Sequence, residues 1–90
     1  MKSHTTPSFR KLFAGLPADI QAQARADYRQ FLLDPNYPGL HLHQITRGKE
    51  TLYSVYVGIH YRALATREDG DLYWFWIGHH SVYDKIVAGR

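Results

Sequence analysis

The stretch IHYRALATREDGDLYWFWIGH (residues 59–79) decides the fold. Aromatic, β-branched and apolar residues dominate both of its halves, as they do in β-strands. Asp69-Gly70 between two such runs is the strongest short-range hairpin signal. We therefore predict strands over 59–67 and 72–79. A two-residue loop places Arg62 opposite Ile77 and His60 opposite His79, so that Arg62 shares a sheet face with both histidines.

Two more strands are predicted upstream of this hairpin. Residues 40–45 alternate apolar with polar side chains, and residues 52–57 are rich in Tyr and Val. The expected sheet is therefore antiparallel and four-stranded. Ser81 with Asp84 three residues later forms a weakened capping box, which predicts a short last helix that begins at Ser81 and ends near Gly89.

The N-terminal third has a helical period instead. Its apolar side chains recur at steps of three and four residues: Phe9, Phe13, Leu16, Ile20, Ala24, Tyr28 and Phe31. Pro17 breaks this pattern and suits the first turn of a new helix, so we expect helices over 8–15 and 17–33. The predicted fold is α+β, with an N-terminal helical hairpin packed on the four-stranded sheet and a short C-terminal helix.

Length and composition restrict the possible functions. Ninety residues, 44% of them hydrophobic, are enough for one small domain, taken as residues 1–90. A net charge of +3 is compatible with a polyanionic partner but does not require one. With no cysteine, disulfides, thiolate metal sites and a cysteine nucleophile are excluded. No apolar stretch is as long as that of a signal peptide or a membrane span, which predicts a cytoplasmic protein.

Two segments carry a family resemblance. The run Tyr61-Arg62-Ala63-Leu64 and the segment IGHHSVYDKI (residues 77–86), in this order after a helical hairpin, resemble the RelE/ParE superfamily of toxins from bacterial type II toxin–antitoxin modules. The resemblance implies a RelE-like fold and a cognate antitoxin as partner. RelE-type members are ribosome-dependent endoribonucleases that cut mRNA and inhibit translation, whereas ParE-type members inhibit DNA gyrase without nuclease chemistry.

The resemblance also suggests site residues. Arg62 matches the family's sheet arginine that holds the scissile phosphate, and His80 matches a histidine that acts as general acid or base. Tyr83 matches an aromatic residue three positions later, and His79 is the alternative to its neighbour. We also assign RNA or phosphate binding to a set of basic and titratable side chains: Arg47, Lys49, Arg67, His60 and His43.

The residue types fit metal-free RNA cleavage. Histidine can act as acid or base near neutrality, and a guanidinium can hold two phosphate oxygens at once. The strand around Tyr56 has no Lys or Arg where the family often has one. Two alternative functions therefore stay open: a toxin that inhibits DNA gyrase, and a degenerate module that only binds an antitoxin. His41 and His43 alone are a weak metal signal, so we predict no metal and no small-molecule cofactor.

Overall fold

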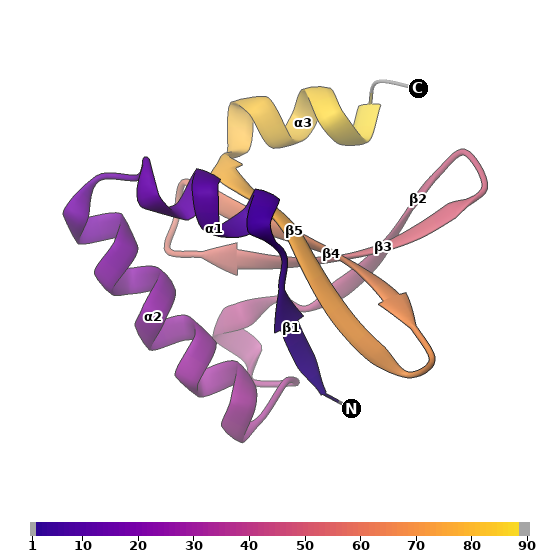
Figure 1. Ribbon diagram of the computed structural model, residues 1–90, viewed down its shortest axis with the longest axis horizontal. Coiled ribbons are helices and arrows are strands. Elements are labelled where there is room, and N and C mark those ends of the chain that lie inside the picture. The colour runs from indigo at the N-terminus through magenta and orange to yellow at the C-terminus, as the bar shows by residue number, and fades with distance from the viewer. Residues whose placement is uncertain (1, 89–90) are drawn as a thin grey trace.

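A five-stranded sheet is the centre of the fold (Figure 1). The computed structural model describes residues 2–88, and the strand order is β1-β5-β4-β3-β2. The strands are β1 (Ser3–Thr5), β2 (His43–Arg47), β3 (Glu50–Val57), β4 (Tyr61–Glu68) and β5 (Asp71–His79). The helices are α1 (Pro7–Ala14), α2 (Ala18–Leu33), a one-turn 3-10 helix (Pro38–Leu40) and α3 (His80–Ala88). The α+β class and the order of the parts are as predicted.

The predicted strand number was one too low. The four antiparallel strands are present, and β1 is an additional strand that runs parallel to β5. Backbone N–H groups of Thr6 and Leu72 donate to the carbonyls of Trp74 (3.1 Å) and Lys2 (2.9 Å) on either side of this short pairing. A three-residue polar strand has neither the length nor the apolar alternation that reveals strands in a sequence.

The predicted hairpin register is correct only near its turn. Thr66 lies opposite Tyr73, as a two-residue loop requires, but the register shifts between Leu64 and Ala65 because Phe75 is an extra residue on β5. Beyond this bulge Arg62 lies opposite Gly78, not Ile77. A single inserted residue moves every following side chain to the other face of the sheet.

The first two helices cover one face of the sheet. Thr6 caps α1 by accepting a hydrogen bond from the Phe9 N–H (3.2 Å), and Pro7 occupies the first turn. The core under these helices is formed by buried apolar side chains: Ala24, Phe31, Leu40, Val55, Val57, Ala63, Ala65, Leu72, Trp74 and Ile77. The predicted helical stripe is therefore confirmed as core-facing at Ala24 and Phe31, with other members of the stripe partly buried against it.

The two helices of the predicted hairpin pack on different strands of the sheet. The Gln21 amide donates to the carbonyls of Phe13 (3.1 Å) and Ala14 (3.2 Å), which fixes the turn between the helices. From this turn α1 extends along β5, whereas α2 contacts β3. A groove of about 340 Å³ with an almost entirely apolar lining lies between the helices and the sheet, bordered by Phe13, Tyr28 and Trp74 among others.

The last helix lies against the opposite face. Its residue Tyr83 is buried, and the ring centroid lies 6.5 Å from that of Trp76 on β5. The helix begins at His80, one residue before the predicted start, and its predicted end near Gly89 lies outside the described residues. None of the helices within residues 2–88 is long and apolar enough to cross a membrane.

Candidate functional site

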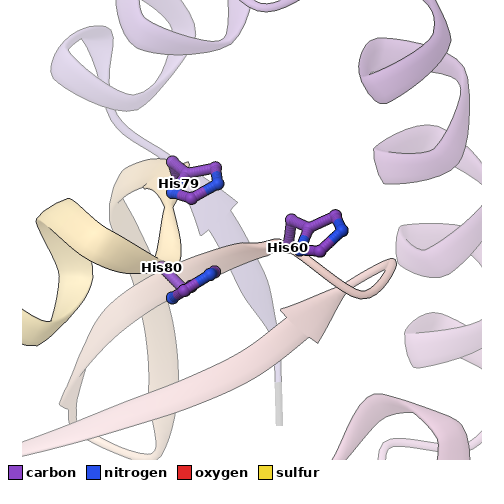
Figure 2. Close-up of side chains that lie close together, drawn as sticks. All are labelled: His60, His79 and His80. Atoms are coloured by element: carbon purple, nitrogen blue, oxygen red, sulfur yellow. The ribbon is translucent and has the colours of Figure 1, made fainter.

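Three histidines converge where β5 meets α3 (Figure 2). His60 comes from the turn before β4, His79 is the last residue of β5, and His80 is the first of α3. One ring nitrogen from each lies within 4.8 Å of those from the other two. The His79 and His80 ring centroids are 4.4 Å apart, and each lies about 6 Å from that of His60. Because His60 and His79 are exposed and His80 is half-buried, the cluster is open to a ligand.

The backbone explains why these rings meet. Gly58 supplies the left-handed conformation (φ 63°) of the turn that leads into β4. The backbone N–H of His80 donates to the carbonyl of His60 (2.8 Å), which extends the β4–β5 pairing past the end of the strands. Our sequence prediction paired His60 with His79; the bulge in β5 pairs it with His80 and leaves His79 opposite Tyr61.

The groups next to the His79 and His80 rings indicate which nitrogen of each ring carries the proton. The backbone N–H of Ser81 donates to Nδ1 of His79 (3.1 Å), so the neutral His79 ring carries its proton on Nε2. On His80, Nδ1 lies 3.8 Å from a carboxylate oxygen of Asp84, which favours a proton on Nδ1 and leaves Nε2 as an acceptor. In these tautomers Nε2 of His79 is a hydrogen-bond donor and Nε2 of His80 is an acceptor.

Arg62 lies beside this cluster on β4. Its Nη1 donates to the carbonyls of Ile59 (3.1 Å) and Tyr61 (2.8 Å), which flank His60 in the chain. The guanidinium carbon lies 3.6 Å from the ring centroid of Tyr56 on β3, a close cation–π contact. His41 also contacts that ring, at 4.4 Å between centroids. In the sequence, Tyr56 was notable only because its strand lacks the Lys or Arg that the family often has. In the structure, its ring packs against the Arg62 guanidinium.

Tyr83 lies in a different environment from the histidines. It is buried under α3 with its ring against Trp76. Tyr83 therefore packs α3 against the sheet. It is connected to the cluster by the first turn of α3, which begins at His80.

The basic residues predicted to bind RNA or phosphate lie away from the histidine cluster. Arg47 pairs with Glu50 (3.0 Å) beside the β2–β3 turn that holds Lys49. Arg67 lies near the other hairpin, where it donates to the Tyr53 hydroxyl (3.5 Å) and thereby lowers the pKa of that tyrosine. Six residues of β4 at about 3.3 Å each separate Arg67 from the histidine end, about 20 Å.

His43 and His41 also lie outside the cluster. His43 is exposed on β2, and its Nδ1 lies 2.6 Å from the carbonyl of His41. This contact occupies one ring nitrogen with a backbone group. The histidines that converge could not be distinguished from the others by sequence alone, because the convergence depends on the bulge in β5.

The sequence matches one family model. The model of the ParE-like toxin domain matches residues 18–85, which span α2 to α3. A comparison with curated protein sequences finds no match.

Solved toxin structures share the fold. An archaeal RelE–RelB complex from Pyrococcus horikoshii is similar with a TM-score of 0.66 at 12% identity, covering 87% of this chain and 92% of that one. A RelB–RelE antitoxin–toxin complex from Methanococcus jannaschii gives 0.62 at 20%, covering 89% and 94%. A copper-bound mutant toxin from Helicobacter pylori gives 0.60 at 17%, covering 91% and 97%.

Proposed function

This chain belongs to the ParE-like toxin domain family, within the RelE/ParE superfamily, and we propose that it is an endoribonuclease that cuts mRNA on the ribosome. The observation that carries the proposal is the cluster of His60, His79 and His80 beside Arg62. It combines two proton-transfer groups with a phosphate-binding group, which are the requirements of metal-free RNA cleavage.

The proposed reaction uses the two neighbouring rings in opposite roles. Nε2 of His80 takes the proton of the ribose 2′-hydroxyl, and the 2′-oxygen attacks the phosphorus. The bond from phosphorus to the 5′-oxygen breaks, and Nε2–H of His79, in its imidazolium form, protonates that leaving oxygen and becomes neutral. The products are a 2′,3′-cyclic phosphate and a 5′-hydroxyl end. The Asp84 carboxylate beside Nδ1 of His80 supports the role of Nε2 as base, and the Ser81 hydroxyl at 2.9 Å can accept a hydrogen bond from Nδ1–H of the His79 imidazolium.

Arg62 is proposed to bind the phosphate during this reaction. Among the described residues its hydrogen bonds come from Nη1, so Nη2 and Nε are available to phosphate oxygens. The Tyr56 ring fixes the guanidinium plane, which reduces the entropy lost on binding. His60 adds a third imidazole to the same phosphate, whereas Tyr83 would act by holding the first turn of α3 in place.

We further propose that a cognate antitoxin binds this chain. Two of the similar solved structures are toxin–antitoxin complexes. The apolar groove between α1, α2 and the sheet offers an apolar helix of the antitoxin a surface to bury. Co-purification of the chain with the product of a neighbouring small gene would test this, and Phe13→Asp in the groove should abolish the complex.

Gyrase inhibition is the second candidate function. The matching family model is of the ParE-like type, and the three predicted basic residues Arg47, Lys49 and Arg67 lie at the end of the sheet away from the histidines. Inhibition of DNA supercoiling by purified gyrase, with intact ribosome-bound mRNA, would favour it.

The decisive experiment is cleavage of ribosome-bound mRNA by the purified chain in the presence of EDTA. We expect cleavage by the wild-type protein, a loss of about 100-fold or more in His80→Gln and in Arg62→Gln, and little change in His4→Gln. His4 is a matched control because it is a histidine at the opposite end of β5, next to Asp71. Absence of cleavage by a folded wild-type chain would contradict the proposal.

A further inference from the structure

The same three histidines also have the composition of a metal site. Neutral imidazole is a preferred ligand of Zn²⁺, Cu²⁺ and Ni²⁺, and three imidazoles with one open position are a common arrangement for zinc. Among residues 2–88, His60, His79 and His80 are the one group of three or more His, Asp or Glu side chains with ligand atoms this close together. We propose that they form a binding site for a divalent transition metal ion.

The distances are compatible with coordination. Three nitrogens no more than 4.8 Å apart all lie within about 2.8 Å of a common point. Metal–nitrogen bonds of about 2.0 to 2.1 Å therefore require each ring to move by less than about 1 Å. Because His60 and His79 are exposed, rotation of their side chains provides this movement without a change of the core.

Two polar neighbours would orient the ligands. When His79 coordinates through Nε2, its proton moves to Nδ1, and Nδ1–H donates to the Ser81 hydroxyl oxygen at 2.9 Å in place of the bond from the Ser81 backbone N–H. The Asp84 carboxylate, 3.8 Å from Nδ1 of His80, supports a proton on that nitrogen and coordination through Nε2. Such partners of the non-ligating nitrogen raise metal affinity, and their removal typically costs 10- to 100-fold.

The nearby positive charge is held to one side. Arg62 would repel a dication, but its guanidinium lies against the Tyr56 ring and two backbone carbonyls. The Asp84 carboxylate supplies a compensating negative charge next to His80. The metal therefore binds at the end of the sheet, with its open position toward solvent.

Occupation of this site would have a consequence for the proposed nuclease. A metal coordinated by Nε2 of His79 and His80 removes the nitrogens that the reaction needs for proton transfer, so the ion would inhibit cleavage. This consequence rests on the proposed function, whereas metal binding itself does not.

The test is titration of the untagged full chain with ZnCl₂ alone, followed by calorimetry and by the thermal unfolding midpoint. We expect one equivalent of Zn²⁺ to bind and to raise the midpoint, because the ion binds only the folded arrangement. His60→Gln, His79→Gln and His80→Gln should each weaken binding by tenfold or more, and Ser81→Ala should weaken it about tenfold. The control His4→Gln should bind as the wild type does.

Titration with CuCl₂ gives a second measurement that needs no stability change. The electron paramagnetic resonance spectrum should show coupling to imidazole nitrogens, reduced in each cluster variant and unchanged in His4→Gln. No binding by the folded wild-type chain, or equal binding by all variants, would overturn the site. If Zn²⁺ binds but the metal-free chain cuts no RNA, the metal site stands and the nuclease proposal fails; cleavage without Zn²⁺ binding gives the reverse.

Discussion

The two ends of the sheet both contain basic or titratable side chains, but these cluster at one end and lie apart at the other. At the end with the turn into β4, three histidines converge, and Arg62 donates hydrogen bonds to the backbone carbonyls on either side of His60. At the hairpin end, Arg47 is paired with Glu50 and Arg67 lies against Tyr53, each on its own hairpin. Chemistry needs groups that act on the same atom, whereas binding needs only charge along the path of a polymer. This difference is why we propose the reaction at the first end and accessory contacts at the second.

The largest expected effect comes from a substitution at the histidine end. His80→Gln should lower the rate of cleavage of ribosome-bound mRNA by about 100- to 10,000-fold, because it removes the proposed general base while keeping a similar shape. Single-turnover cleavage measures this rate. An unchanged rate would show that the cluster is not the reaction centre.

A backbone substitution tests how rigidly this end is held. A Cβ added to Gly78 would lie 2.6 Å from the Trp76 ring, and that ring contacts Tyr83 of α3. Gly78→Ala should therefore destabilise the fold by about 1 to 3 kcal/mol through overpacking and displace His80, the first residue of α3. Urea unfolding and the cleavage rate measure the two effects. Gly48→Ala is the contrasting variant, since its open surroundings leave only the backbone cost of its φ of 61°.

Substitutions at the hairpin end should have a smaller effect on activity. Replacing Arg47, Lys49 and Arg67 together with Gln should raise the KM for ribosome-bound mRNA by about two- to tenfold at low salt and leave kcat unchanged. The KM difference should shrink as the salt concentration rises. A fall in kcat comparable to that of His80→Gln would contradict the division between the two ends.

The smallest expected effect concerns the pH dependence of stability at the hairpin end. The Lys2 backbone N–H (3.2 Å) and the His4 ring (3.3 Å) both bond to Asp71 and lower its pKa. A lowered pKa contributes stability above the unfolded-state pKa, and this contribution is lost as the pH falls through the folded-state value. Asp71→Asn should thus lower the melting temperature slightly at pH 7, and the difference from the wild type should shrink as the pH falls below the unfolded-state pKa of about 3.9. Thermal scans across this range check the sign.

Most of the fold could be predicted from the sequence because its signals are local. The helical stripe from Phe9 to Phe31 and the Asp69-Gly70 turn each act within a few residues, and the predicted helices and strands agree with the observed ones to within a few residues. The short strand β1 escaped prediction because its partner, β5, lies about 70 residues away and its own side chains are polar.

The candidate site was harder to predict because it depends on one extra residue. Without the bulge at Phe75, His79 would lie opposite His60, and His80 would be one residue farther along. Nothing in the run Trp74-Phe75-Trp76 indicates which residue bulges, since all three are aromatic and suit either face. The sequence therefore indicated which residue types form the site, histidine and arginine, but not which histidines lie next to one another.

The three-residue strand β1 also matters for how the protein behaves in solution. It pairs with Leu72, Tyr73 and Trp74 on the outer side of β5, where the backbone of these residues would otherwise be unpaired. A long apolar edge is a template on which a second chain can add its own strand, whereas a short polar edge is a poor one. We therefore expect Ser3–Thr5 to protect the sheet from aggregation, and a variant that lacks them should self-associate through β5.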